Sequence, residues 1–258
     1  MYSIKAHAKI NSFLKITGHH NGYHTIMSRF IQLENLYDTI SFVPCKCETF
    51  TIEGIDGVET KANTIYKAFV ALSDYSGNLD LLDFFYHHKV VVTKNIPSQA
   101  GLGGGSSNAG AFLRLVNEIC DINLETPILA NIGSQVGADV PFFVYNYTTA
   151  NVSGFGEIVE PFDEEPLRVE LFYPKTKCDT ALVYKTFKQN FFDSIEPQKF
   201  SHWKYLPSRE VINEADNDPI VLNDLFKAAL LAYPSLKNQT PKESLFSGSG
   251  STFFKVLR

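Results

Sequence analysis

A run of glycines in the middle of the chain constrains its fold more than any other feature. Residues 97–109 read Pro-Ser-Gln-Ala-Gly-Leu-Gly-Gly-Gly-Ser-Ser-Asn-Ala, so four of the 16 glycines lie within five residues. Glycine leaves the backbone bare, and its N–H groups can then approach a ligand closely. An apolar stripe at helical spacing follows, at Ala109, Phe112, Leu113, Val116 and Cys120. A glycine loop that opens a helix presents free N–H donors and the positive end of the helix dipole, which predicts a phosphate-binding loop.

Two common phosphate-binding motifs do not fit this loop. No Lys-Ser/Thr pair follows the glycines, so the loop is not a Walker A motif. The dinucleotide fingerprint needs its glycines early in a βαβ unit, whereas the preceding predicted strand, residues 89–93, lies well inside this chain. A flexible loop before an ordinary helix is the alternative. The paired serines, the helix start and the upstream strand argue against it.

Composition narrows the class of protein. With 258 residues, of which 44% are hydrophobic, the chain can bury one large core or two modest ones. A net charge of −5 argues against a nucleic-acid partner. No apolar run approaches the ~20 residues of a membrane span, and the first residues lack the apolar stretch of a signal peptide. We therefore expect no membrane association and a cytoplasmic location.

The four cysteines do not show a metal-binding pattern. Cys45, Cys47, Cys120 and Cys178 have no Cys-x-x-Cys spacing and no histidine cluster near them, so we expect free thiols rather than structural zinc. Cys45 and Cys47 are predicted to alternate on a strand and to share one face, where they pack rather than react.

Strand and helix patterns alternate without a regular βαβ rhythm, which predicts the α+β class. The first part has predicted strands at 2–9 and 26–43 joined by a turn at 19–22, a helix from Asn63 to about Ser76, a strand at 87–93, a helix at 124–136, and extended segments at 141–145, 148–154 and 167–173. A second part has predicted helices at 179–189 and 219–232 and a strand at 252–257. Residues 190–218 are predicted to be a surface excursion, with a mobile lid as the alternative. We expect two domains, 1–173 and 174–258, with a soft boundary at Pro174.

Two charged residues lie in apolar surroundings. Asp139 stands in Gly-Ala-Asp-Val-Pro-Phe-Phe, before a predicted buried strand, and Lys9 lies in Ala-His-Ala-Lys-Ile-Asn. Buried charges need a partner or hydrogen bonds. One ion pair at a shared site explains both residues economically. A helix-cap or turn role for Asp139 is the alternative.

The segment from Pro97 to Ser107 resembles the phosphate loop of the GHMP small-molecule kinases, which bind ATP there and phosphorylate an alcohol or phosphate of a metabolite. Three further segments match in order: residues 8–24 with Gly-Tyr-His, residues 137–143, and Phe-Ser-Gly-Ser-Gly-Ser-Thr-Phe-Phe at 246–254. Together they are similar to those members that act on a cytidine-diphosphate-linked polyol. The resemblance implies the GHMP kinase fold, with two α/β subdomains and the active site in the cleft between them.

The resemblance also implies roles for individual residues. Asp139 would be the general base, Lys9 would stabilise charge at the transferred phosphate, and Asn11 would orient the substrate. Tyr23 and Tyr184 would sandwich the cytosine while His24 reads its edge; ordinary packing is the alternative for the tyrosines. Gly248 would support the phosphate loop or flank the substrate diphosphate, with a simple hairpin turn as the alternative. The ATP-binding positions would be Pro97, Gly101, Leu102, Gly103, Gly104, Gly105, Ser106, Ser107, Asn63 and Lys94.

Mg²⁺ is expected near the Ser107 hydroxyl, and Asn63 and Lys94 are expected at the adenosine. His7 departs from the family pattern, which has proline there, and so does the His20-Asn21 pair. Neither touches a proposed catalytic group. The chain is expected to be a monomer or weak homodimer. The alternatives are another GHMP kinase, such as a homoserine kinase, or a non-catalytic ligand-binding relative.

Overall fold

The computed structural model describes residues 1–20, 22–55 and 57–257. Two compact units alternate along the chain. Unit 1 comprises residues 1–8, 33–97 and 103–147, and unit 2 comprises residues 9–32, 98–102 and 148–258. The predicted division into domains 1–173 and 174–258 stays a prediction. Among the described residues, no helix is both long and apolar enough to cross a membrane.

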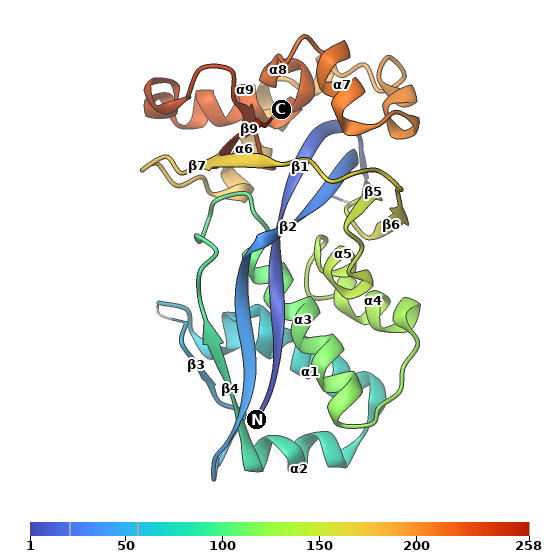
Figure 1. Ribbon diagram of the computed structural model, residues 1–258, viewed down its shortest axis with the longest axis vertical. Helices are drawn as coiled ribbons and strands as arrows, with labels where there is room; N and C mark the ends of the chain where they lie inside the picture. Colours follow the sequence, from blue (N-terminus) through green and yellow to red (C-terminus); the bar gives the residue numbers. More distant parts are fainter. Residues whose placement is uncertain (21, 56, 258) are drawn as a thin grey trace. The chain divides into compact units, whose positions relative to one another are not determined.

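Two long paired strands, β1 (Tyr2–His20) and β2 (Tyr23–Pro44), each contribute to both units (Figure 1). Both are longer than the strands predicted at 2–9 and 26–43. Residues 8–16 of β1 are all buried, so this stretch has no exposed face. A strand covered on both faces loses the polar–apolar alternation on which the prediction depends. The predicted turn at 19–22 includes Asn21, which lies outside the described residues.

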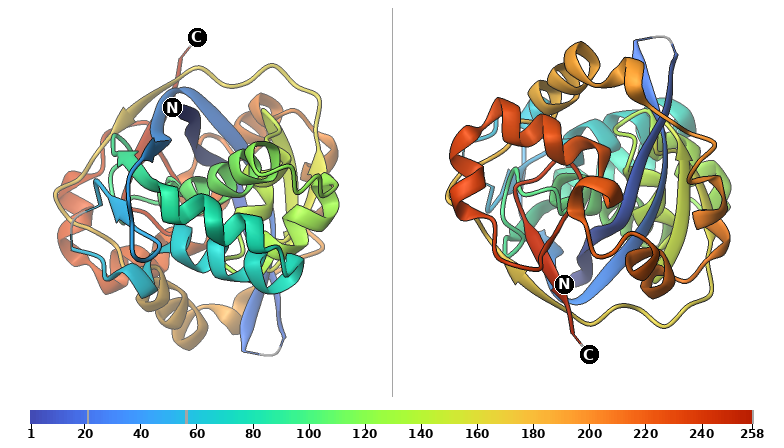
Figure 2. Two further views of the ribbon diagram at one scale, coloured as in Figure 1. Left: turned by 90° about the horizontal axis from the view of Figure 1, so that it is seen from below. Right: turned by 90° about the horizontal axis from the view of Figure 1, so that it is seen from above.

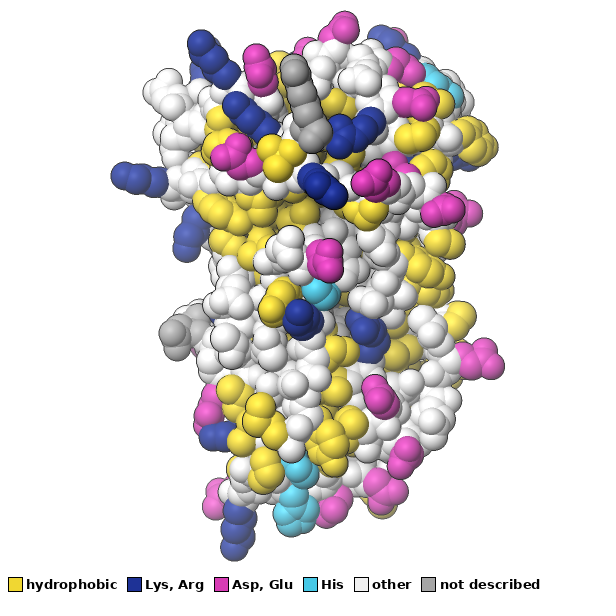
Figure 3. Space-filling model, viewed as in Figure 1, with side chains coloured by type: hydrophobic (Ala, Val, Ile, Leu, Met, Phe, Trp, Pro, Cys, Tyr) yellow, Lys and Arg dark blue, Asp and Glu magenta, His cyan; other side chains and the backbone are white. Residues whose placement is uncertain are grey.

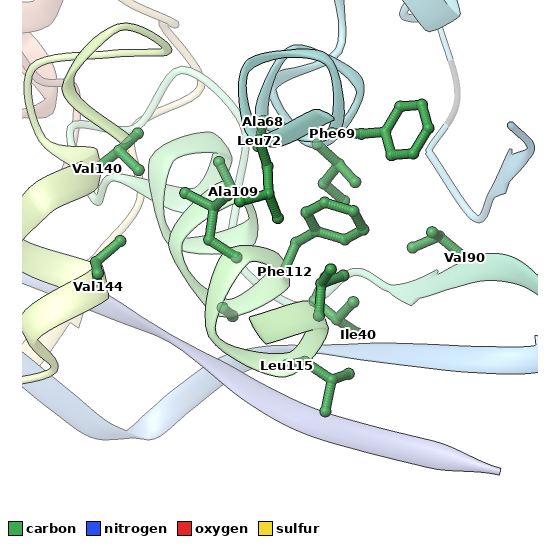
Figure 4. Packing of buried hydrophobic residues seen from close by; sticks show 14 of the residues in the cluster. Ile40, Ala68, Phe69, Leu72, Val90, Ala109, Phe112, Leu115, Val140 and Val144 are labelled. Carbon is green, nitrogen blue, oxygen red and sulfur yellow. The ribbon is translucent and has the colours of Figure 1, made fainter. Parts of the chain in front are cut away.

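Unit 1 places helices against a small sheet. Strand β4 (His88–Thr93) pairs antiparallel with β2 and parallel with β3 (Ile52–Glu53). The helices are η1 (Thr60–Ala62), α1 (Thr64–Ser76), α2 (Leu79–His87), α3 (Gly104–Ile119), α4 (Thr126–Ser134) and α5 (Val140–Tyr145). Helix α3 packs against α1, α4 and α5 (Figure 2, left). Side chains from α1, α3, α5, β2 and β4 converge in one apolar core around Phe112 (Figure 4).

Unit 2 holds two groups of strands. The first part of β2 pairs antiparallel with β5 (Thr149–Gly154), which pairs with β6 (Ile158–Pro161). A separate antiparallel sheet has the order β7 (Val169–Phe172), β9 (Phe253–Val256), β8 (Leu245–Phe246). The helices are α6 (Thr180–Asn190), η2 (Phe192–Ser194), η3 (Ser201–Tyr205), α7 (Ser208–Glu214), α8 (Pro219–Leu222), α9 (Asp224–Ala232) and η4 (Pro234–Gln239). Helices α6 and α9 pack together (Figure 2, right).

Several predicted elements are confirmed and others are wrong. Asn63 caps α1 through a hydrogen bond that its Oδ1 accepts from the Ile65 N–H at 2.9 Å. The extended segment predicted at 141–145 is helix α5, because a short apolar run does not distinguish a buried strand from a buried helix. The helix predicted at 219–232 is two helices, since Asn223 is extended and caps α9. Residues 190–218, predicted to be a surface excursion, contain the short helices η2, η3 and α7; most of their residues are exposed, and Trp203 is buried.

The expectation that all four thiols are free is also wrong. Cys45 and Cys47 form a disulfide directly after β2 ends at Pro44, whereas Cys120 and Cys178 are free.

On the face drawn in Figure 3, acidic and basic side chains are interspersed, in keeping with the small net charge of −5.

Candidate active site

The first half of the glycine loop, in unit 2, lies against the segment between β8 and β9. Gly101 has φ +72°, and a Cβ there would come within 2.2 Å of the Ser247 carbonyl oxygen. The Ser247 hydroxyl donates to the Gly101 carbonyl at 3.1 Å, and the Thr252 N–H donates to the Ala100 carbonyl at 3.1 Å. Any side chain at position 101 would push these two backbone segments apart. Glycine is therefore required both because a side chain would clash and because the backbone has a positive φ.

The second half of the loop, in unit 1, opens helix α3. Gly103 is its N-cap, in the left-handed region at φ +71°, and the Ser107 N–H makes a helical bond to the Gly103 carbonyl at 2.8 Å. The N–H groups of Gly104, Gly105 and Ser106 therefore belong to the first turn, where no intrahelical acceptor exists. Gly105 is exposed. Donors of this kind, with the helix dipole behind them, suit a phosphate group.

The Ser107 side chain is less accessible than the resemblance implies. Its side chain is buried, with 1% of the residue exposed, and its hydroxyl donates to the His7 carbonyl at 2.6 Å. That bond uses the hydroxyl hydrogen and leaves the oxygen lone pairs. The described residues contain no cluster of three or more His, Cys, Asp or Glu side chains that would hold a metal. The residues present fit Mg²⁺ as an ion that arrives with nucleotide phosphates, which is its usual mode of binding.

The two residues expected at adenosine lie on different parts of unit 1. Asn63 is buried and its Oδ1 is used in capping α1. Its neighbour Thr64 donates its hydroxyl to the Gly105 carbonyl at 2.7 Å, which joins the start of α1 to the glycine loop. Lys94 forms an ion pair with the fully buried Asp38, and its Nζ lies 3.5 Å from where a Cβ on Gly104 would be. Lys94 therefore lies beside the glycine loop. Asp38, which the sequence motifs did not indicate, holds the Lys94 side chain there.

Lys9 is buried in unit 2 and is positioned by neighbouring side chains. Only 3% of the residue is exposed, and its Nζ donates to Asn11 Oδ1 at 2.6 Å and lies 4.1 Å from the centre of the Phe30 ring. Its backbone N–H donates to the Leu102 carbonyl at 3.0 Å, which ties β1 to the glycine loop. Asn11 Nδ2 in turn donates to Ser28 Oγ at 2.8 Å. The ammonium therefore has a fixed direction in a dry environment.

Asp139, in unit 1, is half-buried at the N-cap position of α5. Its carboxylate makes no capping hydrogen bond to that helix, so the helix-cap alternative does not explain the residue. The predicted strand after it is absent, and Pro141 in the first turn of α5 suits a helix start. The local structure thus leaves the Asp139 side chain outside the hydrogen bonding of its own helix.

Gly248 belongs to the hairpin between β8 and β9 and also reaches the site. The Ser247 N–H donates to the Thr252 carbonyl at 3.1 Å, as in a hairpin. A Cβ on Gly248 would lie 3.1 Å from the Gly101 carbonyl oxygen and 3.4 Å from Asn11 Oδ1. Asn223 Nδ2 donates to the Gly248 carbonyl at 2.9 Å and to the Phe246 carbonyl at 3.0 Å. Within unit 2, the segment 246–254 therefore lies beside Gly101 of the glycine loop and beside Asn11. Asn223 holds this segment through its two hydrogen bonds.

Of the residues expected to bind cytosine, His24 and Tyr184 lie together in unit 2, whereas Tyr23 packs against a different ring. The His24 ring lies 5.4 Å from Tyr184 and 5.1 Å from His19, measured between ring centres. Tyr23 is 68% exposed and packs against Phe155 at 5.7 Å. Burial, with smaller contributions from His19 and Lys188, lowers the pKa of His24. Within the described part of the chain His24 Nε2 is buried without a hydrogen-bond partner. The lowered pKa favours the neutral imidazole, and the Tyr184 ring beside it is an aromatic surface of the kind that stacks on a flat base.

Unit 2 also contains two buried ion pairs that the sequence motifs did not indicate. Arg29 is fully buried; it pairs with Glu164 at 3.1 Å and lies 3.3 Å above the Phe162 ring. Lys15 pairs with Asp224. Burial raises the pKa of Asp224, and the positive charge of Lys15 acts in the opposite direction. Both cations stand inside apolar strand segments, which is the signal that singled out Lys9. The same pattern in β1 and β2 therefore predicts buried partners for Lys15 and Arg29.

Comparison with known proteins agrees with this geometry. Residues 63–147 match the family model described as the GHMP kinases N terminal domain. The chain is 56% identical over 256 residues to 4-diphosphocytidyl-2-C-methyl-D-erythritol kinase of Sulfurovum sp. (strain NBC37-1), with 99% of each chain covered. It is 43% identical over 256 residues to the protein of that name from Sulfurimonas denitrificans, with 98% of this chain and 96% of the other covered.

A solved structure shows the same relationship in three dimensions. A crystal structure of 4-(cytidine 5'-diphospho)-2C-methyl-D-erythritol kinase aligns with a TM-score of 0.73 at 27% identity, covering 100% of this chain and 90% of that one. The expected GHMP kinase fold is therefore confirmed. The chain belongs to the 4-diphosphocytidyl-2-C-methyl-D-erythritol kinase family of the GHMP kinases.

Proposed function

We propose that this chain transfers the γ-phosphoryl group of ATP to the 2-hydroxyl of 4-(cytidine 5'-diphospho)-2-C-methyl-D-erythritol, a step in the non-mevalonate route to isoprenoid precursors. Full-length relatives that carry the kinase name support the activity. The structural observation that carries the proposal is the buried Lys9 ammonium, directed by Asn11 and tied through its backbone to the glycine loop. A preorganised cation in a water-poor site acts strongly on charge that develops during phosphoryl transfer.

The roles of the residues follow from their chemistry. Asp139 accepts the proton of the substrate hydroxyl, whose oxygen forms a bond to the γ-phosphorus as the bond to the leaving ADP oxygen breaks. Lys9 stabilises the negative charge on the transferred group. The first-turn N–H groups of Gly104 and Gly105 bind phosphate oxygens, and Lys94 adds a cation beside them. Mg²⁺ bound to the nucleotide would neutralise phosphate charge near Ser107.

Aromatic residues of unit 2 account for substrate choice in this proposal. The exposed Tyr23 and Tyr184, which lies beside His24, stack on the cytosine, and His24 reads its edge. Asn11 orients the polyol, and Gly248 lies beside the substrate diphosphate. The cytoplasmic location and the monomeric or weakly dimeric state expected from the sequence stay predictions.

The test measures ADP formation from ATP with the cytidine-diphosphate-linked polyol, homoserine and mevalonate in parallel. Turnover of the first alone supports the proposal; turnover of homoserine instead would assign the chain to a different GHMP activity. Asp139→Asn should lower kcat by roughly 10²–10⁴-fold, the range for loss of a general base. Lys9→Ala should lower kcat more than ATP affinity. Asp74→Asn, at an exposed position on α1, and Lys237→Ala, at an exposed position on η4, are matched controls that should leave kcat unchanged.

A further inference from the structure

One pair of side chains with redox chemistry plays no part in the proposed reaction. Cys45 and Cys47, in unit 1, form a disulfide across the single exposed residue Lys46. We propose that this pair is a reversible thiol–disulfide site, opened by dithiol reductants of the thioredoxin class and closed by disulfides of the glutathione class.

The bond is poorly suited to a structural role. A disulfide stabilises a protein mainly by restricting its unfolded chain, and the effect grows with the number of residues enclosed. This one joins cysteines separated by only two positions. The segment is also held by other contacts, because the Cys45 N–H donates to the His87 carbonyl and the Cys47 N–H to the Tyr86 carbonyl, each at 2.9 Å. Opening the bond therefore leaves the segment in place.

The geometry permits exchange in both directions. Both cysteines are half-buried, and Pro44, Lys46 and Glu48 around them are exposed, so a reductant's thiolate can reach the sulfurs. The two Cα atoms lie 5.6 Å apart, within the range that a disulfide requires. Because the backbone hydrogen bonds keep this spacing, the reduced pair can close again without a rearrangement of the chain.

The other two cysteines provide an internal contrast. Burial raises the pKa of Cys178 to about 11, and burial with nearby Asp121 and Asp80 raises that of Cys120 to about 11. Thiols of this kind remain protonated at neutral pH, whereas thiolate is the reactive form. Redox chemistry in the native protein should therefore be confined to the Cys45–Cys47 pair.

The exchange balances as a two-electron transfer. A thiolate of the reductant attacks one cysteine sulfur, the Cys45–Cys47 bond breaks, and a mixed disulfide forms while the other cysteine leaves as a thiolate. The second thiol of the reductant then attacks the mixed disulfide and releases the second cysteine. The reductant becomes a disulfide, and its two protons end on the two cysteines. Glutathione disulfide drives the reverse reaction and leaves as two glutathione molecules.

The experiment equilibrates the native full-length chain in a series of ratios of reduced to oxidised glutathione, then traps thiols with N-ethylmaleimide and measures intact mass. We expect a gain of two adducts on passing from oxidising to reducing buffer. Trypsin cleaves after Lys46, so digestion without reductant should keep the two resulting peptides linked only in the oxidised sample. Cys120→Ser should leave the two-adduct gain unchanged, and Cys45→Ser should abolish it.

Three outcomes would overturn the proposal. The pair could carry adducts at every glutathione ratio, which would mean that no disulfide forms. The bond could resist excess dithiothreitol in the native protein, which would make it a fixed structural bond. The gained adducts could map to Cys120 or Cys178. None of these measurements uses kinase activity, so their result is independent of the proposed function.

Discussion

Removal of the Ser28 hydroxyl is the most informative change, because Ser28 determines which way the Asn11 amide faces. Ser28 Oγ lies 2.5 Å from the Phe13 carbonyl oxygen, to which it donates its single hydrogen. It can therefore only accept from Asn11 Nδ2, at 2.8 Å. That leaves Asn11 Oδ1 facing Lys9 Nζ at 2.6 Å. Ser28 is thus a positioning residue for the proposed catalytic ammonium.

The magnitude follows from what Ser28→Ala leaves unpaired. Asn11 and Ser28 are 1% and 0% exposed, so water does not replace the lost acceptor. A buried unsatisfied donor costs about 1–3 kcal/mol. The amide can relieve this by rotating, but its NH₂ would then face the Lys9 ammonium. If the cost appears in the transition state, kcat falls by roughly 5- to 150-fold, since about 1.4 kcal/mol corresponds to a factor of ten.

The assay is steady-state ADP formation with the cytidine-diphosphate-linked polyol, accompanied by thermal unfolding of each variant. Ser28→Ala should lower kcat while the KM for ATP stays near its original value, because the glycine-loop amides do not depend on Ser28. Ser28→Thr keeps the hydroxyl on a residue that suits a strand, and it should restore most of kcat. An unchanged kcat in Ser28→Ala, or a loss that only tracks the unfolded fraction, would refute the reasoning.

Three further predictions concern unit 2. Tyr184→Leu should weaken CDP binding by roughly 5- to 150-fold, from the ~1–3 kcal/mol of base–aromatic stacking, with ATP binding unchanged in the same titrations; the exposed Tyr205→Leu is its control. Arg29→Met, which leaves Glu164 buried without its cation, should lower the free energy of unfolding in urea by about 3–5 kcal/mol, and a loss below about 1 kcal/mol would contradict this. Because burial lowers the pKa of His24, unfolding takes up a proton as the pH falls below the ordinary value of 6.5, so stability should decline there. His24→Gln should remove that part of the decline in thermal unfolding measured across this range, and an unaltered profile would count against it.

The sequence alone was sufficient for features that depend on local chemistry. The glycine loop and the helix after it follow from residues 101–119, and the α1 cap follows from Asn63 and the apolar spacing behind it. The ordered motifs predicted the GHMP kinase fold and the kinase family, and the comparisons confirm both. The sequence predicts these features because a left-handed glycine or a capping side chain acts within a few residues of its own position.

Tertiary structure decided what depends on distant neighbours. Residues 141–145 become a helix because their apolar side chains pack against α3 and α4, a preference that a five-residue run does not encode. The direction of the Lys9 ammonium depends on Ser28, 17 positions beyond Asn11. The partner of the buried Arg29 lies 135 positions away. A charge in an apolar strand signals that a partner exists, but burial and hydrogen bonding select that partner only when the chain is folded.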